Sequence, residues 1–144
     1  MNSIHRILRN GAAIERVDLV RATINEAEEI KDNLLDDMDF KKIIVDLSTC
    51  NYIDSTFFGA LVFAYRILKH QNSQMVLVIS KTFLSRSFIY KEIASVFKVY
   101  HSVAEALDAL NSDQRQVYNH NYEIAENKRE PVRIVQLPLQ LIQE

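Results

Sequence analysis

A serine that could carry a regulatory modification lies where a buried strand gives way to a helix. The apolar run Lys42–Leu47 predicts a buried strand, and a short loop then brings Asp54 and Ser55 to the start of an apolar helix. Backbone N–H groups in a first helical turn lack partners within the helix, and the helix dipole is positive there. A phosphate on Ser55 would therefore be stabilised. In the alternative, both residues are only structural: Asp54 is an N-cap and Ser55 simply occupies the first turn. Spacing alone favours that interpretation.

A catalytic role for the same serine has little support. A nucleophilic Ser55 would need a histidine within hydrogen-bond reach. His70 lies at the far end of the same predicted helix, about 20 Å away at the usual rise per residue. His5, His101 and His120 are candidates by residue type only, and no Gly-x-Ser-x-Gly segment forms a nucleophile elbow. We therefore expect a protein that is not an enzyme.

The composition argues against several other kinds of site. The histidines lack metal-ligand spacing and Cys50 is the single cysteine, so neither a metal site nor an intrachain disulfide is expected. Two glycines are too few for a glycine-rich phosphate loop, and we expect no cofactor. The acidic cluster Asp36, Asp37 and Asp39 is most simply a solvated helix end. A net charge of −2 gives no support for a nucleic-acid partner.

The length and hydropathy are those of an ordinary soluble domain. The 144 residues, 48% hydrophobic and 25% charged, suffice for one core. The longest apolar run, Phe57–Tyr65, is much shorter than the roughly 20 residues that cross a bilayer. The N-terminus lacks the apolar core of a signal peptide, and a single cysteine suits a reducing compartment. We expect a cytoplasmic protein without membrane insertion.

The helix after Ser55 has two distinct faces. Its predicted core face consists of apolar residues at helical spacing: Phe57, Leu61, Ala64 and Leu68. The opposite face carries Ser55, Gly59, Val62 and Arg66, with Phe63 at its border. A solvated face is normally charged, so its apolar members indicate either a cover from the C-terminal segment or a protein interface.

The elements that must position this helix form an α/β pattern. Asn10-Gly11, between two apolar segments, predicts an opening β-hairpin. Thr23 or Asn25 caps a first helix whose apolar stripe is Ala27, Ile30, Leu34 and Met38. The apolar runs 43–47 and 75–79 predict central strands, joined in parallel through the helix of Ser55.

The later part of the chain predicts two more helices and a short strand. One helix is expected from about Thr82 to Phe97, with Ile89, Ile93 and Val96 facing inward, followed by a strand at 99–101. A capping box at Ser102 and Glu105 opens a last helix that buries Leu107 and Leu110. We therefore predict one domain over residues 1–110, with four or five strands in a mixed sheet and about four helices.

Residues 111–144 form an extension of different composition. After a polar stretch, apolar residues alternate with polar ones between Val132 and Ile142, which is strand periodicity. Pro138 excludes a central position in a sheet. This segment is expected to be an edge strand or a tail that orders on a partner, with slow amide exchange.

The segment around Ser55 resembles the STAS domain of bacterial anti-sigma factor antagonists. The resemblance rests on Val45-Asp46-Leu47, Tyr52–Thr56 and Gly59-Ala60-Leu61, with a second match from Phe97 to Ser102 and on to Leu107. It covers roughly residues 4–110. Two positions depart from the usual pattern, because Phe57 and Glu92 stand where many members have glycine.

The resemblance implies a STAS-like fold and a phosphorylation-switched binding module. It implies that unphosphorylated protein binds an anti-sigma factor or related serine kinase, that phosphorylation of Ser55 releases it, and that a cognate phosphatase resets it. The alternative is a STAS subunit of a membrane lipid-transport ATPase complex with no phosphorylation cycle. The resemblance leaves open whether the protein forms a homodimer. The candidate partner-binding residues are Asp54, Thr56, Phe58, Gly59, Val62, Phe63 and Arg66.

Overall fold

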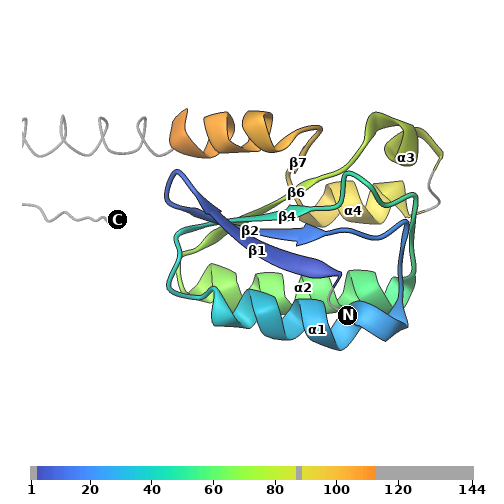
Figure 1. The fold of residues 1–144 in the computed structure, drawn as a ribbon, viewed down its shortest axis with the longest axis horizontal. Helices are drawn as coiled ribbons and strands as arrows, with labels where there is room; N and C mark the ends of the chain where they lie inside the picture. Colours follow the sequence, from blue (N-terminus) through green and yellow to red (C-terminus); the bar gives the residue numbers. More distant parts are fainter. Residues whose placement is uncertain (1–2, 87–88, 113–144) are drawn as a thin grey trace, which may run out of the picture. The chain divides into compact units, whose positions relative to one another are not determined.

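A five-stranded mixed sheet forms the frame of the domain (Figure 1). The computed structural model describes residues 3–86 and 89–112. Its strands are β1 (Ile4–Arg9), β2 (Ala12–Val17), β4 (Lys42–Asp46), β6 (Gln74–Val78) and β7 (Val99–Tyr100). The spatial order is β1-β2-β4-β6-β7, and all neighbours are parallel except β1 and β2. The predicted α/β fold and the central position of the two apolar runs are confirmed.

The opening hairpin has the turn that its sequence predicts. Asn10 and Gly11 both have positive φ, at 51° and 79°, which suits the right-handed twist of the flanking strands. Ile7 pairs with Ile14 in the resulting antiparallel register. One side of β1 is bonded to β2, and within the described residues no strand pairs with its other side.

Four helices and a second, two-stranded sheet complete the elements with defined bounds. The helices are α1 (Ile24–Asp36), α2 (Ser55–His70), α3 (Lys81–Arg86) and α4 (Tyr90–Val96). The small sheet pairs β3 (Arg21–Ala22) with β5 (Tyr52–Ile53) in parallel. Figure 1 shows α1 and α2 side by side along one face of the large sheet.

The main core lies between that face and the helices. Alternate strand residues, among them Ile43, Val45 and Leu77, are fully buried together with Ile30 and Leu34 of α1. The predicted core face of α2 is also buried, because its four apolar residues are at most 1% exposed. Met38 contradicts the predicted stripe of α1: it is 41% exposed, since the helix ends at Asp36 and the chain turns away.

The helix predicted from Thr82 to Phe97 is wrong in its extent. Two helices, α3 and α4, take its place, and the side chain of Ser80 caps the first by accepting from the N–H of Phe83 at 3.1 Å. Ile93 is buried as expected, and Ile89 and Val96 are half-buried.

A helical segment at 103–112 follows β7, as predicted. Ser102 accepts from the N–H of Glu105 at 3.1 Å, while Glu105 accepts from the N–H of His101 at 2.8 Å, one residue earlier than in a standard capping box. Two compact units divide the chain after Leu107. The segment Val132–Ile142 lies outside the described residues, so its strand character and the domain limit at residue 110 stay predictions.

Candidate functional site

Ser55 is the first residue of α2, and its side chain is exposed. Asp54 before it is extended and caps the helix: its Oδ1 accepts from the N–H of Phe57 at 2.8 Å. Oδ2 of the same carboxylate accepts from the N–H of Ile24, the first residue of α1, at 2.9 Å. One carboxylate therefore fastens the N-terminal ends of two helices. The predicted cap is confirmed, and its second partner could not be read from local sequence.

The small sheet holds Asp54 and Ser55 in place. β5 runs directly into them, and its partner β3 lies just before the cap of α1. The N–H of Asp54 donates to the carbonyl of Ala22 at 3.1 Å, which continues the pairing beyond the strands. Thr23 caps α1 with a complete capping box to Glu26. This pairing explains why residues 30 positions apart meet at one carboxylate.

A cavity of about 670 Å³ opens beside Ser55. It is lined by residues 48–55 together with Ser80, Thr82, Phe83 and Ile89. Hydroxyl and amide groups dominate its polar part, including Ser48, Asn51 and Ser80, and Asp54 is the one carboxylate among the described lining residues. A phosphate on Ser55 would therefore bring about −1.5 to −2 charges to a cavity wall whose described residues include one carboxylate.

The outward face of α2 extends away from Ser55. Thr56, Gly59 and Arg66 are exposed, and a Cβ added to Gly59 would meet no atom within 4 Å. The ring of Phe63 is 52% exposed, with the Lys31 ammonium 5.4 Å from its centroid. This half-exposed ring is the largest apolar group on the outward face of α2.

Two of the predicted partner-binding residues also serve the core. Phe58 is half-buried and packs edge-on against Phe97, with ring centroids 6.0 Å apart. Val62 is half-buried against the core as well. The structure thus brings Asp54, Thr56, Gly59, Phe63 and Arg66 to the surface of one helix, while Phe58 and Val62 offer only part of their side chains.

Three exposed apolar residues near this end were not singled out from the sequence. Val20 is 58% exposed, Ile24 64% and Tyr52 40%. The N–H of Asn51 donates to the carbonyl of Val20, and Tyr52 pairs with Arg21, so Val20 and Tyr52 occupy successive positions along the same strand pairing. Ile24 is tied to Asp54 by its N–H. Arg21 stacks on the Tyr52 ring at 4.0 Å. Only the tertiary pairing of two short strands reveals this group, because no helical or strand period connects its members.

Two other reactive side chains, Cys50 and His101, have defined surroundings. Burial raises the pKa of the Cys50 thiol to about 12, so the group stays protonated at neutral pH. The ring Nδ1 of His101 lies 2.9 Å from the carbonyl oxygen of Ile79, which accepts a hydrogen bond from it. Within residues 3–86 and 89–112, no three His, Cys, Asp or Glu side chains form a group suited to a metal ion. Helices in this same part of the chain are too short or too polar to cross a membrane.

The sequence profile of the STAS domain matches residues 14–106, which include the whole site. The chain belongs to the STAS domain family. The match confirms the resemblance found around Ser55 and covers the sheet from β2 to β7.

Solved STAS structures share this fold at low sequence identity. An anti-sigma factor antagonist from Mycobacterium paratuberculosis matches with a TM-score of 0.64 and 15% identity, covering 75% of this chain and 92% of that one. The anti-sigma factor antagonist SpoIIAA in its unphosphorylated form matches at 0.57 and 14%, covering 75% and 97%. The Bacillus cell fate determinant SpoIIAA in its phosphorylated form matches at 0.56 and 14%, covering 74% and 98%.

Proposed function

We propose that this STAS protein is a phosphorylation-switched binding module of the anti-sigma factor antagonist type. In the unphosphorylated state it binds a switch kinase or anti-sigma factor, and phosphorylation of Ser55 by that kinase releases it. A phosphatase restores the binding state. ATP belongs to the kinase, so the module itself acts by binding and needs no cofactor. Both partners are proteins of the cytoplasm.

One observation carries this proposal: the exposed hydroxyl of Ser55 lies where a cavity wall and the outward face of α2 meet. A partner that covers this end of the helix must desolvate Ser55. A phosphate there would lie beside the carboxylate of Asp54, which accepts from one N–H of α1 and one N–H of α2. Added charge at a desolvated surface disrupts docking, whereas the fold tolerates it at an exposed helix N-terminus.

The proposed docking surface combines the outward face of α2 with the exposed apolar residues near its N-terminal end. Phe63 supplies a half-exposed aromatic ring, and aromatic side chains are the usual anchors of protein interfaces. Ile24 and Tyr52 extend the apolar area on the side of the small sheet. Arg66 lies at the rim. The partner therefore presents an apolar surface with polar groups that pair with the cavity wall.

Two measurements test the proposal. Intact-mass analysis of the protein from its native cells should reveal a singly phosphorylated form, with the phosphate on Ser55 in the fragment spectra. A Ser55→Ala variant should lose that form and keep binding the partner. If the Ser55→Ala variant is phosphorylated as efficiently as wild type, the phosphorylation site is another residue, and the exposed Thr56 is the next candidate. A protein without phosphate that is recovered with a transport ATPase would instead identify a structural subunit of a lipid transporter.

A further inference from the structure

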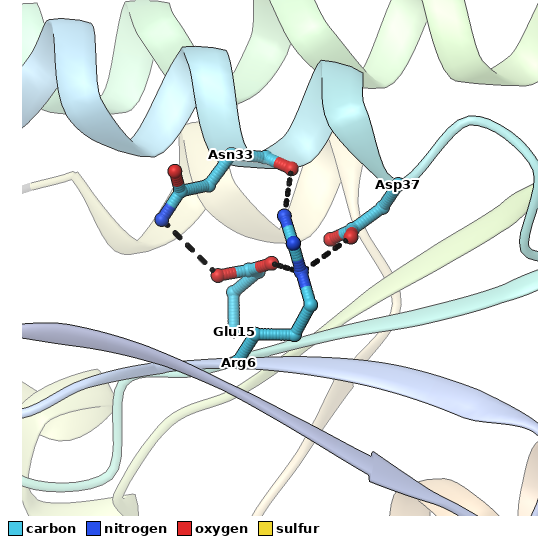
Figure 2. A network of polar contacts seen from close by, with 4 residues as sticks. All are labelled: Arg6, Glu15, Asn33 and Asp37. Atoms are coloured by element: carbon cyan, nitrogen blue, oxygen red, sulfur yellow. Dashed lines mark hydrogen bonds and ion pairs between the residues drawn. The ribbon is translucent and has the colours of Figure 1, made fainter.

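Two buried carboxyl groups face each other where the opening hairpin meets the end of α1 (Figure 2). Glu15 of β2 is 0% exposed and Asp37, which follows the last residue of α1, is 1% exposed. In the sheet Glu15 lies between Arg6 of β1 and the uncharged Val45 of β4. The groups that act electrostatically on Asp37 are Glu15 from β2, Arg6 from β1 and Asp36 from α1.

The hydrogen-bond donors around this pair are directed to Glu15. The Nε–H of Arg6 donates to Glu15 Oε2 at 2.9 Å, and the amide of Asn33 donates to Glu15 Oε1 at 3.4 Å. The Nη2 of Arg6 donates to the backbone carbonyl of Asn33 at 3.0 Å. Both oxygens of Glu15 are therefore hydrogen-bonded, as a buried carboxylate requires.

Asp37 lacks such donors. Its Oδ1 lies 2.8 Å from Arg6 Nε, but the single hydrogen on that nitrogen is directed to Glu15. In the described part of the chain, neither Oδ atom of Asp37 accepts a hydrogen bond. A buried charge without donors is very costly, and such groups usually become neutral instead. Two neighbouring carboxyl groups can also hydrogen-bond to each other only when one of them carries a proton.

We propose that Asp37 and Glu15 share one proton in the folded protein, and that this proton stabilises the contact between the hairpin and α1. The proton resides on Asp37, which then donates to Glu15, so that one of its two orphaned oxygens gains a hydrogen bond. One guanidinium and one carboxylate remain, so the buried cluster is neutral. Loss of the proton leaves two anions around a single cation, at the helix end where the dipole is negative.

The direction of the pKa shift agrees with this arrangement. Burial contributes most to raising the pKa of Asp37 to about 8, followed by the hydrogen bond to Glu15 and its charge, while Arg6 acts in the opposite direction. The folded protein thus binds a proton that the unfolded chain, with an ordinary aspartate, releases near pH 4. The stabilisation is complete below about pH 4 and is lost progressively as the pH rises to about 8.

Urea unfolding of the full chain between pH 5 and pH 9 tests the proposal through the variant Asp37→Asn. Asparagine resembles the neutral acid in shape and cannot titrate. One extra proton in the folded state changes the unfolding constant about tenfold per pH unit. Between pH 5 and pH 7 the wild-type unfolding constant should therefore rise about 100-fold relative to that of the variant.

Asp36→Asn is the matched control, because it makes the same chemical change one residue earlier on an exposed side chain. It should follow the wild-type pH dependence. Parallel curves for wild type and Asp37→Asn would overturn the proposal. A carbon NMR titration of the wild-type carboxyl groups decides the matter even if the variant fails to fold. An inflection near pH 8 at residue 37 supports the shared proton, and an inflection below about pH 5 at that residue refutes it.

Discussion

Two aspartates at helix ends have opposite surroundings in this domain. Asp54 precedes α2, where its carboxylate accepts one N–H from α2 and another from α1. Asp37 follows α1, where the dipole is negative, the side chain is buried and no described donor reaches it. The first site stabilises negative charge and the second opposes it. A phosphate is thus compatible with the Ser55 end, while the Asp37 end retains a proton.

The largest effect should come from fixed charge at the Ser55 end. Ser55→Asp should weaken partner binding by about 3 kcal/mol, roughly two decades in affinity, because it sets a charge against a desolvated surface. Isothermal calorimetry with the kinase measures this. Ser55→Ala, the neutral control, should bind like wild type. Equal affinities for the two variants would show that the partner docks away from this helix end.

Removal of the apolar anchor should affect binding without affecting the fold. Phe63→Ala should cost about 2 kcal/mol of binding, roughly a 30-fold loss, because a half-exposed ring loses partner contacts and few core contacts. Its melting temperature should barely change. Phe57→Ala is the contrasting control, since that ring is fully buried and its loss costs about 3–5 kcal/mol of stability. A large stability loss in Phe63→Ala with binding intact would make that ring part of the core.

The cap that joins two helices can be tested directly against Asp37. Asp54→Ala should lower the free energy of unfolding by about 2 kcal/mol, the upper end for a single cap, because two N–H groups lose their acceptor. Asp54→Asn should cost less, since its one amide oxygen still accepts from one helix. Chemical denaturation at pH 7 measures both. Asp37→Asn in the same assay should leave stability unchanged or raise it. An equal loss for both asparagine variants would contradict the difference between the two aspartates.

The smallest effect concerns the glycine on the outward face of α2. Gly59→Ala should raise the unfolding free energy by up to about 1 kcal/mol, because alanine is the better helix former and the added Cβ meets open space. It should weaken binding if the partner approaches the backbone there. Gly11→Ala should instead destabilise the protein, because the φ of +79° is strained for alanine. Thermal unfolding of both variants, with binding measured for Gly59→Ala, tests this pair.

Local patterns in the sequence were sufficient to predict the helices and strands that position Ser55. The turn at Asn10-Gly11, a cap at Thr23 or Asn25 and the buried face of α2 all follow from short-range chemistry. The structure confirms the turn and the buried face, and it shows that the cap is Thr23. The order of apolar runs also indicated a parallel crossover through the helix of Ser55. The family resemblance around that serine required no structure either, since it rests on adjacent residues.

The spacing of apolar residues did not predict where helices end. Apolar residues at helical intervals suggested one helix from Thr82 to Phe97, although two shorter helices, α3 and α4, form there. Met38 continued the period of α1 beyond the point where the helix ends. Periodicity records which faces are apolar, but it does not record where hydrogen bonding along the backbone stops.

Only the tertiary structure decided the surroundings of the two aspartates. By sequence, Asp54 was a cap for one helix, and Asp37 belonged to a solvated acidic cluster with Asp36 and Asp39. The fold instead ties Asp54 to α1 through the β3–β5 pairing and buries Asp37 against Glu15 of β2. Charge stability depends on donors and burial within a few ångströms, and these come from residues far away in the chain. The sequence by itself determined which groups can ionise, while packing decided where a charge is tolerated.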